Sequence, residues 1–460
     1  ISFAKTHAKW LIPLACILIA MFFSIWLRAL PATLPATDDW AKDNVHSYYK
    51  NQITTQINQQ YPNLPDVNKQ TLIEKDFQKV LISQKATIQQ QIQVTSQSFK
   101  NRLQDNQGQT YLLAIDPYFW LRHAQHYLDN GHMGTTLIGG QYPVPEKVKV
   151  IYPEMDFTKP TSWDGQRMAP IGSPVDVTLH DYIIAYLFII LNIFSTVSLM
   201  TASFWVPVLI SSLSIIPAFF ITRRFAGNVG GLLAALLLAI HPAFVNRTAG
   251  GFSDTDAYNV FFPLVIVWLF LEAFSTKDLK KKIGLAVLAG LTTGIYALVW
   301  RWWFIFTIII GAIGIYLIYL LVINWNQIKS IHKNKSIKNT LSIGLTFFLS
   351  SGLFVSLFSS FSDFKNSLLA PIKVSAKIKA VAVTTIWPNI KTTVAELNPA
   401  SIPTTIAQMG GNLLFLIALI GIAFTILKKD PDTKKRDLKF ALLLSIWFIA
   451  AIYASTKGIR

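Results

Sequence analysis

The sequence predicts an all-α integral membrane protein, a polytopic helical bundle with about nine spans and a large outer first loop that contains amphipathic helices. Of its 460 residues, 52% are hydrophobic and only 14% are charged, and the mean hydropathy is +0.41. These values are typical of membrane proteins rather than soluble domains. Apolar runs of about 20 residues, the length that a helix needs to cross ~30 Å of hydrocarbon, recur along the chain.

The composition also limits the possible partners and metals. A single cysteine excludes a disulfide framework and a thiolate metal site, so any metal should be held by oxygen or imidazole. The formal charge of +17 does not indicate nucleic acid, because most Lys and Arg residues lie in short loops between apolar runs, where they set the membrane orientation. We therefore expect membrane lipids, and no nucleic acid, among the partners.

Nine apolar segments are predicted to cross the membrane. They are residues 10–28, 200–221, 229–246, 259–274, 283–299, 303–323, 340–359, 412–427 and 440–455. Basic residues gather in alternate loops, at 223–224, 277–282, 329–338 and 428–439. Because basic loops stay in the cytoplasm, the other loops should lie on the extracytoplasmic face of a multi-pass protein in the cell membrane.

Five regions follow from this topology. They are the first span, 1–28; an outer first loop, 29–199; a transmembrane bundle, 200–359; a second long outer loop, 360–411; and the last two spans, 412–460. Residue 1 is not Met and the chain stops directly after an apolar run, so we expect both ends to be incomplete.

Two helices are predicted inside the first outer loop. Residues 181–198 are apolar enough to span, but a span there would invert every later basic loop, so we expect an interfacial or re-entrant helix on the outer face. Residues 67–102 have apolar side chains mostly three or four positions apart, which predicts an amphipathic helix. We assign no chemistry to this second helix.

Three acidic motifs fall on the outer face beside predicted spans, where charged groups are costly and tend to mark function. The first is Asp116, in the sequence AIDPYFWLR. The proline that follows it favours a helix N-terminus, so a plain N-cap is the simplest interpretation of this residue alone.

The second motif is Asp254-Thr255-Asp256, immediately outside the predicted span 229–246. Two carboxylates two residues apart can converge on one divalent cation, or they can simply cap the next helix. Arg247, seven residues before Asp254, can orient a carboxylate or hold a phosphate.

The third motif is Glu396, in TTVAELNPASIP, within the outer loop 360–411. Loops of this length in compact proteins are usually functional or disordered. Asp363 is the only other acid in the loop and lies close to a span, so Glu396 is the candidate for a further carboxylate from this side.

Together these motifs resemble the catalytic subunit of oligosaccharyltransferase, including the single-subunit archaeal and bacterial enzymes of the membrane-embedded GT-C glycosyltransferases. Asp116 in IDPYFWLR resembles the first-loop aspartate of this family. NRTAGGFSDTD resembles its second-loop motif, with Arg247, Asp254 and Asp256 at matching positions. Residues 393–396, TVAE, fit its T/S-x-x-E motif.

Two further stretches carry the resemblance. Residues 457–460, KGIR, resemble a K-G-x-R stretch whose arginine faces the pyrophosphate of the lipid-linked substrate, although Arg460 can also be read as a snorkelling residue at a span end. Residues 171–174, IGSP, resemble the stretch that precedes an outer-face helix of the family. The motifs at Asp116, Asp254–Asp256, TVAE and KGIR occur in family order on one membrane face, which makes coincidence improbable.

The resemblance implies transfer of an oligosaccharide from a polyprenyl phosphate or pyrophosphate carrier to the asparagine of an Asn-x-Ser/Thr sequon, with inversion at the anomeric carbon. It implies a Mn²⁺ or Mg²⁺ ion held by Asp116, Asp254, Asp256 and Glu396, acting as a Lewis acid. Arg460 and Lys457 are then expected to hold the carrier phosphate.

The chain departs from the family in three places. It has fewer predicted spans than the usual thirteen, and it lacks the soluble C-terminal domain with the WWDYG motif. Bacterial members have an arginine twelve residues after the motif glutamate, where this chain has Gln408. No Arg or Lys occurs from residue 397 to residue 427, so we expect no requirement for an acid two positions before the acceptor asparagine.

Two alternatives remain open from the sequence. One is another polyprenyl-phosphate-dependent membrane glycosyltransferase, such as a protein O-mannosyltransferase. The other, and the weaker, is a secondary transporter, which predicts acids in the middle of spans rather than at span ends on one face.

Overall fold

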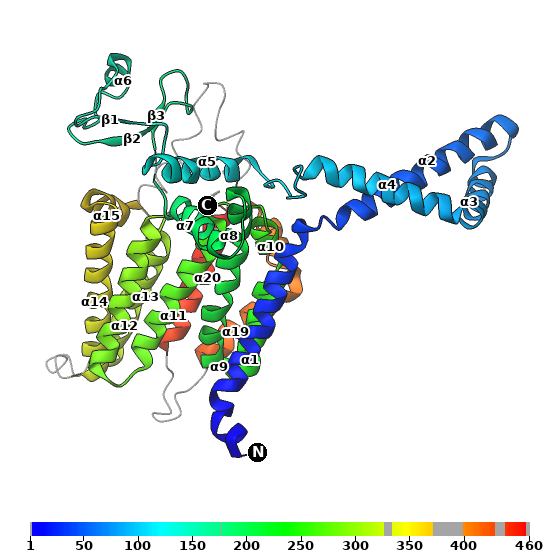
Figure 1. Ribbon diagram of the computed structural model, residues 1–460. Helices are drawn as coiled ribbons and strands as arrows, with labels where there is room; N and C mark the ends of the chain where they lie inside the picture. The colour runs from blue at the N-terminus through cyan, green and yellow to red at the C-terminus, as the bar shows by residue number, and fades with distance from the viewer. Residues whose placement is uncertain (1, 176, 326–333, 371–398, 428–437, 457–460) are drawn as a thin grey trace.

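The computed structural model describes residues 2–175, 177–325, 334–370, 399–427 and 438–456. Figure 1 shows an upright helical bundle, an outer layer above it, and an arm that extends sideways from that layer. The bundle contains α1 (Ser2–Ala29), α8 (Leu199–Leu213), α9 (Ile215–Ile240), α11 (Tyr258–Ser275), α12 (Leu279–Ala297), α13 (Trp303–Ile323), α14 (Lys335–Phe358), α19 (Gly411–Leu427) and α20 (Leu438–Thr456). The predicted all-α membrane architecture is confirmed.

The outer layer and the arm contain shorter elements. The helices are α2 (Ala36–Gln60), α3 (Asp66–Ser83), α4 (Lys85–Leu103), α5 (Ile115–Asn130), α6 (Glu146–Ile151), α7 (Leu179–Phe194), α10 (Pro242–Thr248), α15 (Phe361–Leu368) and α18 (Ile402–Gln408), with the 3₁₀ turns η1 (Leu30–Ala32) and η2 (Thr255–Ala257). One small antiparallel sheet in the order β1-β2-β3 joins β1 (Thr136–Ile138), β2 (Thr161–Asp164) and β3 (Ser173–Pro174).

The predicted number of nine spans is not confirmed. In the described part of the chain, six helical runs are long and apolar enough to cross a membrane, or seven if α18 and α19, bent by 87°, form one span. Most of the predicted spans 200–221 and 229–246 lies in the helical run Leu199–Ile240, which counts once in this number although it reverses direction at its break. In addition, the predicted span 283–299 lies in α12, whose first turns carry Lys280, Lys281 and Lys282.

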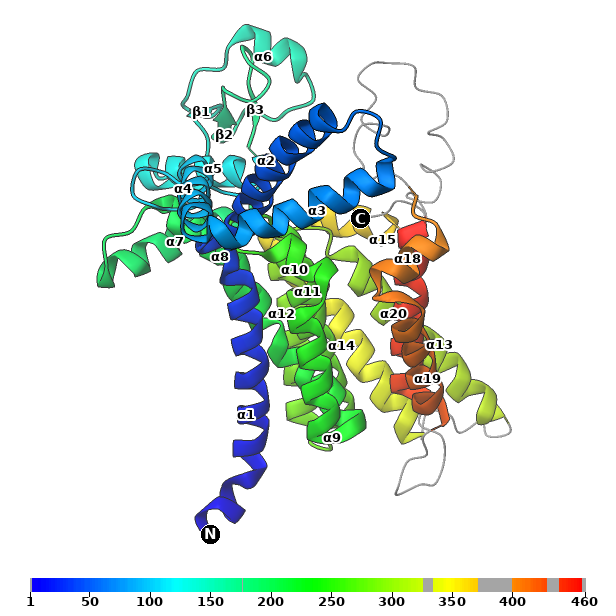
Figure 2. The ribbon, with the colours of Figure 1, turned by 90° about the vertical axis from the view of Figure 1, so that its right-hand side faces the viewer.

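The long run Leu199–Ile240 does not cross as one rod. Its 42 residues would measure ~63 Å if straight, about twice the hydrocarbon thickness. The helical geometry breaks at Ala226 and Gly227, and Gly227 has φ 67°, which favours glycine because it has no Cβ. In Figures 1 and 2, α8 and α10 lie at the outer end while α9 reaches the opposite end. The break therefore reverses the chain, where a turn between residues 221 and 229 was predicted.

The apolar segment predicted at 181–198 forms α7, which is too short to span. Its first turn is closed by a capping box, in which Thr178 and Asp181 bond reciprocally. It lies beside α5 in the outer layer (Figure 1) and exposes Ile193 and Phe194 near its end. This geometry agrees with an interfacial helix.

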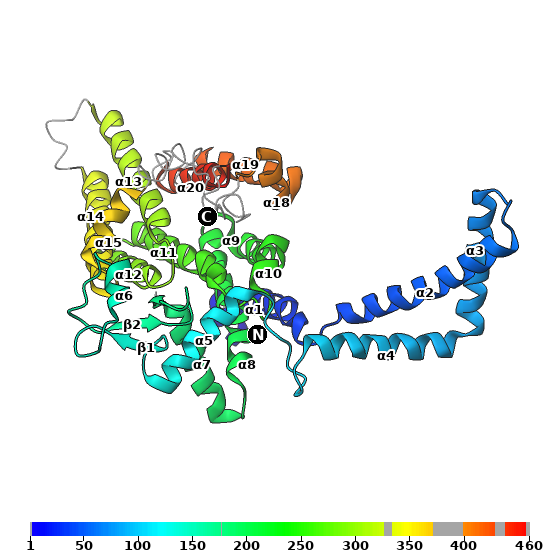
Figure 3. The ribbon, with the colours of Figure 1, turned by 90° about the horizontal axis from the view of Figure 1, so that it is seen from above.

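The arm consists of α2, α3 and α4 and carries its own small core, seen from above in Figure 3. Four buried side chains form this core: Ile53, Ile57, Ile73 and Phe77. The single amphipathic helix predicted over 67–102 is two helices, broken at Gln84 with φ −111° and ψ 24°. The break allows both helices to pack against α2.

Helices α12 and α14 approach each other closely through small residues. A Cβ added to Gly290 would lie 2.0 Å from Ser350 Oγ, and one added to Gly294 would lie 2.5 Å from the Cβ of Phe354. Small residues promote close helix packing in membranes, where van der Waals contacts, rather than the hydrophobic effect, stabilise the association of helices. The buried cluster beside this contact includes Phe270 and Phe347.

Arg28, at the outer end of α1, is completely buried. Its Nε donates to Thr248 Oγ1 at 2.9 Å, and its Nη1 donates to Ser24 Oγ at 3.0 Å and to the Ala239 carbonyl at 2.8 Å. The guanidinium also lies 4.7 Å from the centre of the Phe244 ring. One side chain therefore joins α1 to the end of α9 and to α10.

We predict that Arg28→Lys lowers the free energy of unfolding by about 2 kcal/mol, because an ammonium keeps the charge but cannot reach acceptors on three helices at once. The melting temperature in detergent should fall accordingly. Lys79→Ala, which removes an exposed pair with Asp76 on the arm, is the control and should change it little. An Arg28→Lys protein that melts like wild type would contradict the anchoring role.

Candidate active site

Asp116 lies in the first turn of α5, but it does not cap that helix. The N-cap is Ala114, whose backbone is extended, and no side chain satisfies the cap. The N-cap role considered for Asp116 is therefore not observed. Its exposed side chain instead lines a cavity of about 390 Å³ at the outer end of the bundle.

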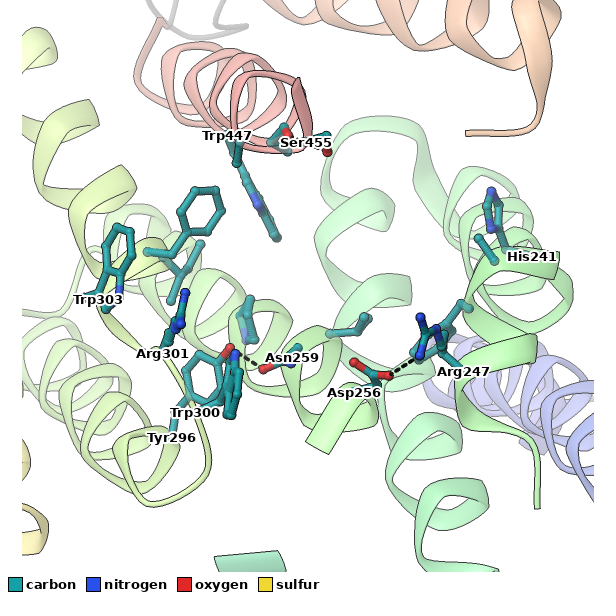
Figure 4. Close-up of a pocket in the computed structure, with 18 residues that line it drawn as sticks. His241, Arg247, Asp256, Asn259, Tyr296, Trp300, Arg301, Trp303, Trp447 and Ser455 are labelled. Atoms are coloured by element: carbon teal, nitrogen blue, oxygen red, sulfur yellow. Dashed lines mark hydrogen bonds and ion pairs between the residues drawn. The ribbon is translucent and has the colours of Figure 1, made fainter. Parts of the chain in front are cut away.

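Asp254 and Asp256 line the same cavity from the segment that leads into α11. Asp254 caps η2, because its Oδ1 accepts a hydrogen bond from the Thr255 backbone N–H at 2.6 Å. The same oxygen accepts a bond from Trp120 Nε1 at 3.1 Å. Asp256 Oδ2 lies 3.9 Å from Arg247 Nη1, and Figure 4 shows these two side chains facing each other.

Backbone hydrogen bonds bring these two distant segments together. The Leu113 N–H, three residues before Asp116, donates to the Gly251 carbonyl at 3.0 Å. The Gly250 N–H donates to the Arg28 carbonyl at 2.7 Å. A Cβ on Gly250 would lie 2.5 Å from the Phe204 ring, and Gly251 has φ 89°, so the turn requires glycine at both positions.

Three of the four predicted carboxylates thus share one cavity. Glu396 lies outside the described residues. Among the residues that are described, no three Asp, Glu, His or Cys side chains lie close enough together to form a ready metal site. The all-oxygen donor set still suits a hard divalent cation in its chemistry.

A larger cavity of about 610 Å³ adjoins the first (Figure 4). Asp256, Asn259 and Trp300 line both cavities. The larger one also receives Arg247 and Arg301, while its apolar lining includes residues of α13 and α20. Asn259 is oriented by Tyr296, whose hydroxyl donates to Asn259 Oδ1 at 2.9 Å.

Among the cavity residues that were not predicted are Trp120, Arg167 and Arg301. Arg301 had a detectable signal, since it lies among Trp300, Trp302 and Trp303 between two apolar runs on the outer face. For Arg167 we find no such signal, because it reaches the cavity from the loop after β2.

The remaining predicted binding residues are only partly placed. Lys457 and Arg460 lie outside the described residues, although Ser455 at the end of α20 lines the larger cavity. Gln408 is the exposed last residue of α18. The chain bends sharply directly after it, at Gly410 with φ 100° and Gly411 with φ 88°.

A buried polar layer lies behind the smaller cavity. His180 Nδ1 lies 3.0 Å from Tyr258 Oη, and its Nε2 lies 3.3 Å from Ser253 Oγ. Burial lowers the pKa of His180 to about 4, so the ring is neutral and can donate from one nitrogen and accept at the other.

A second buried histidine, His123 of α5, lies between two carboxylates. Its Nε2 is 3.6 Å from Asp164 Oδ2, and its Nδ1 is 3.9 Å from Asp181 Oδ2. Burial lowers the pKa of His123 and raises the pKa of Asp181 to about 7, although hydrogen bonds from Thr178 offset part of the latter shift. Burial thus disfavours the charged form of both groups.

Residues 83–460 match the family model described as "Oligosaccharyl transferase STT3, N-terminal". A dolichyl-phosphooligosaccharide-protein glycotransferase of Methanococcus voltae is 33% identical over 396 residues, covering 80% of this chain and 41% of the relative. One of the same name from Methanocaldococcus jannaschii is 27% identical over 440 residues, covering 78% and 45%.

The chain therefore spans less than half the length of these curated relatives. A solved structure of the archaeal oligosaccharyltransferase AglB from Archaeoglobus fulgidus, in complex with an inhibitory peptide and a dolichol-phosphate, is also similar. It has a TM-score of 0.49 and 18% identity, covering 76% of this chain and 46% of that one.

The raised pKa of Asp181 predicts a pH-dependent stability. Between the unfolded value of 3.8 and the folded value of about 7, only the folded state keeps the proton, so this contribution to stability is lost as the pH rises through that window. From pH 6 to pH 8 the loss should be about 1 kcal/mol.

Asp181→Asn keeps an acceptor for Thr178 and removes the titration. Its melting temperature relative to wild type should therefore rise as the pH is increased from 6 to 8. Asp129→Asn, on the exposed side of α5, serves as the control and should give a flat difference. A flat difference for Asp181→Asn as well would refute the buried-proton interpretation.

Proposed function

Because the chain belongs to the oligosaccharyl transferase STT3 family, we propose that it is the membrane-embedded part of an oligosaccharyltransferase. It transfers an oligosaccharide from a polyprenyl phosphate or pyrophosphate carrier to the side-chain amide of asparagine in Asn-x-Ser/Thr. One observation carries the proposal: Asp116, Asp254 and Asp256, from two separate outer segments, line one cavity that adjoins an arginine-bearing cavity in the bundle.

The larger cavity suits the lipid-linked donor. Arg247 and Arg301 offer guanidinium groups to phosphate, and Phe304 and Trp447 offer apolar walls to the prenyl chain. The names of the two archaeal relatives specify a dolichyl-phosphooligosaccharide substrate. Arg460 and Lys457, which follow the cavity-lining end of α20 in the sequence, add positive charge for the same phosphate.

The smaller cavity suits the acceptor asparagine. A carboxamide nitrogen is a poor nucleophile, because its lone pair is delocalised into the carbonyl. Carboxylates that accept the two amide N–H bonds weaken this delocalisation, and one or two of the four acids take this role. The nitrogen then attacks the anomeric carbon from the side opposite the leaving phosphate, which gives inversion. The C–O bond to the phosphate breaks, and one of the carboxylates takes the proton that the nitrogen loses.

A Mn²⁺ or Mg²⁺ ion would be held by Asp116, Asp254, Asp256 and Glu396. Their donor atoms are all oxygen, as such cations prefer, and three of these side chains line one cavity. When bound, the cation supplies Lewis-acid stabilisation of the charge that develops on the leaving phosphate. Arg247, 3.9 Å from Asp256, joins the cation-binding acids to the phosphate-binding groups.

The reaction takes place on the extracytoplasmic face of the cell membrane. In Figure 1 the acidic segments around α5 and α10 lie at the outer end of the bundle, while the basic start of α12 lies at the opposite end. The positive-inside rule assigns the basic end to the cytoplasm. The chain belongs to the oligosaccharyl transferase STT3 family, so the O-mannosyltransferase and transporter interpretations are no longer supported.

We predict that Asp254→Ala and Glu396→Ala each lower the transfer rate by at least about 100-fold, because each removes an anionic group from the cation and substrate site. Transfer from lipid-linked oligosaccharide to a fluorescent sequon peptide by the full-length protein measures this. Glu146→Ala, in an exposed pair with Lys149, is the folded control. Undiminished wild-type turnover after complete chelation of divalent cations would overturn the metal dependence.

We also predict that the enzyme does not require an acid two positions before the acceptor asparagine. Gln408 can donate a hydrogen bond but carries no charge, so it cannot form a bidentate ion pair with such an acid. Two peptides that differ only by Asp or Ala at this position should be transferred at similar rates. A preference for Asp above about tenfold, or ~1.4 kcal/mol in binding, would show that another group supplies the charge.

A further inference from the structure

The carboxylate of Asp254 has one oxygen that is already fully used by the protein. Its Oδ1 accepts from Trp120 Nε1 at 3.1 Å and from the Thr255 backbone N–H at 2.6 Å. A carboxylate oxygen has about two lone-pair sites, so two donors saturate it. Only Oδ2 is then available to bind a cation or an acceptor amide.

The indole of Trp120 is itself held by two buried imidazoles. The ring meets His180 edge to face at 6.0 Å and 86°, and it meets His123 at 6.3 Å and 86°. His180 also contacts Ser253, the residue directly before Asp254, and Tyr258 at the start of α11. His180 therefore contacts both Trp120, the hydrogen-bond donor, and the residue next to Asp254, the acceptor.

Trp120 comes from α5, four residues after Asp116, and both residues line the smaller cavity. Its bond to Asp254 crosses 134 positions of the sequence. One turn of helix thus carries both an acid of the site and the donor that sets the rotation of another acid.

We propose that Trp120 is a positioning residue for the metal site: its indole N–H fixes the Asp254 carboxylate so that this residue binds the cation through Oδ2 alone. The inference rests on the proposed metal-dependent function and assigns to Trp120 a role in how tightly the cation is held. Partners that orient a metal ligand typically change metal affinity by roughly 10–100-fold when removed.

The test is a titration of the purified full-length protein with Mn²⁺, in which free Mn²⁺ is measured by electron paramagnetic resonance. Trp120→Phe keeps an aromatic ring between the imidazoles and removes only the N–H donor. It should weaken Mn²⁺ binding by at least about tenfold. Raising the Mn²⁺ concentration should restore its kcat towards wild type, which would not happen if the ring only supported the fold.

The matched control is Trp163→Phe. Trp163 is buried in the outer sheet, and its Nε1 donates to the Ile171 carbonyl at 3.1 Å, so the same donor is lost away from both cavities. Its Mn²⁺ affinity should equal that of wild type.

A second variant decides the matter if Trp120→Phe does not fold. Trp120→Met removes the same indole N–H and leaves a flexible apolar side chain between the two imidazoles. It should also weaken Mn²⁺ binding by about tenfold.

The outcomes separate the two proposals. Wild-type Mn²⁺ affinity in Trp120→Phe, or in Trp120→Met where that variant decides, overturns the role of Trp120 and leaves the proposed function standing. Absence of Mn²⁺ binding by the wild-type protein overturns both. Equal weakening in Trp163→Phe would show that the effect is not specific to Asp254 and would also overturn the role.

Discussion

The acidic loop between α10 and α11 keeps its position because a buried guanidinium holds the ends of three helices together. Burial of a charge near hydrocarbon is costly unless its hydrogen bonds are satisfied. Arg28 meets part of this cost with neutral oxygens, among them the Ala239 carbonyl near the end of α9, where the helix dipole is negative, while its Nη2 makes no hydrogen bond within the described part of the chain. The backbone carbonyl of Arg28 then binds Gly250, so the same residue fixes the turn that leads to Asp254.

This anchor explains how two outer segments form one site. The Gly250–Gly251 turn bonds to α1 on one side and to Leu113, just before α5, on the other. Asp116 and Asp254 are therefore positioned relative to a common turn rather than to each other. The carboxylates can share a cavity without a compact contact among them, which leaves room for substrate atoms between them.

Much of this arrangement could be predicted from residue types and charge. The basic loops set the topology, and the acids beside span ends identified Asp116, Asp254 and Asp256 as one group before any geometry was known. The interactions of Trp120 and the break at Gln84 could not be predicted, because each depends on side chains brought together by tertiary packing. Trp120 and Asp254 are far apart in sequence, and no repeating spacing of residues indicates which acceptor an indole N–H will bind. The predicted span count is not confirmed, although the reversal at Gly227 lies where the apolar runs and the basic residues 223–224 predicted a turn.

The contact between Arg247 and Asp256 joins the two cavities, since Asp256 lines both and Arg247 lines the larger one. A cation that binds Asp256 weakens the hold of this carboxylate on Arg247, and an anion that binds Arg247 weakens the hold of the guanidinium on Asp256. With the ligands of the proposed function, each would thereby raise the affinity of the protein for the other, and thermodynamic linkage requires the two enhancements to be equal. The ion pair would then couple the cavities energetically, so that neither ligand would be held at full strength until both were present.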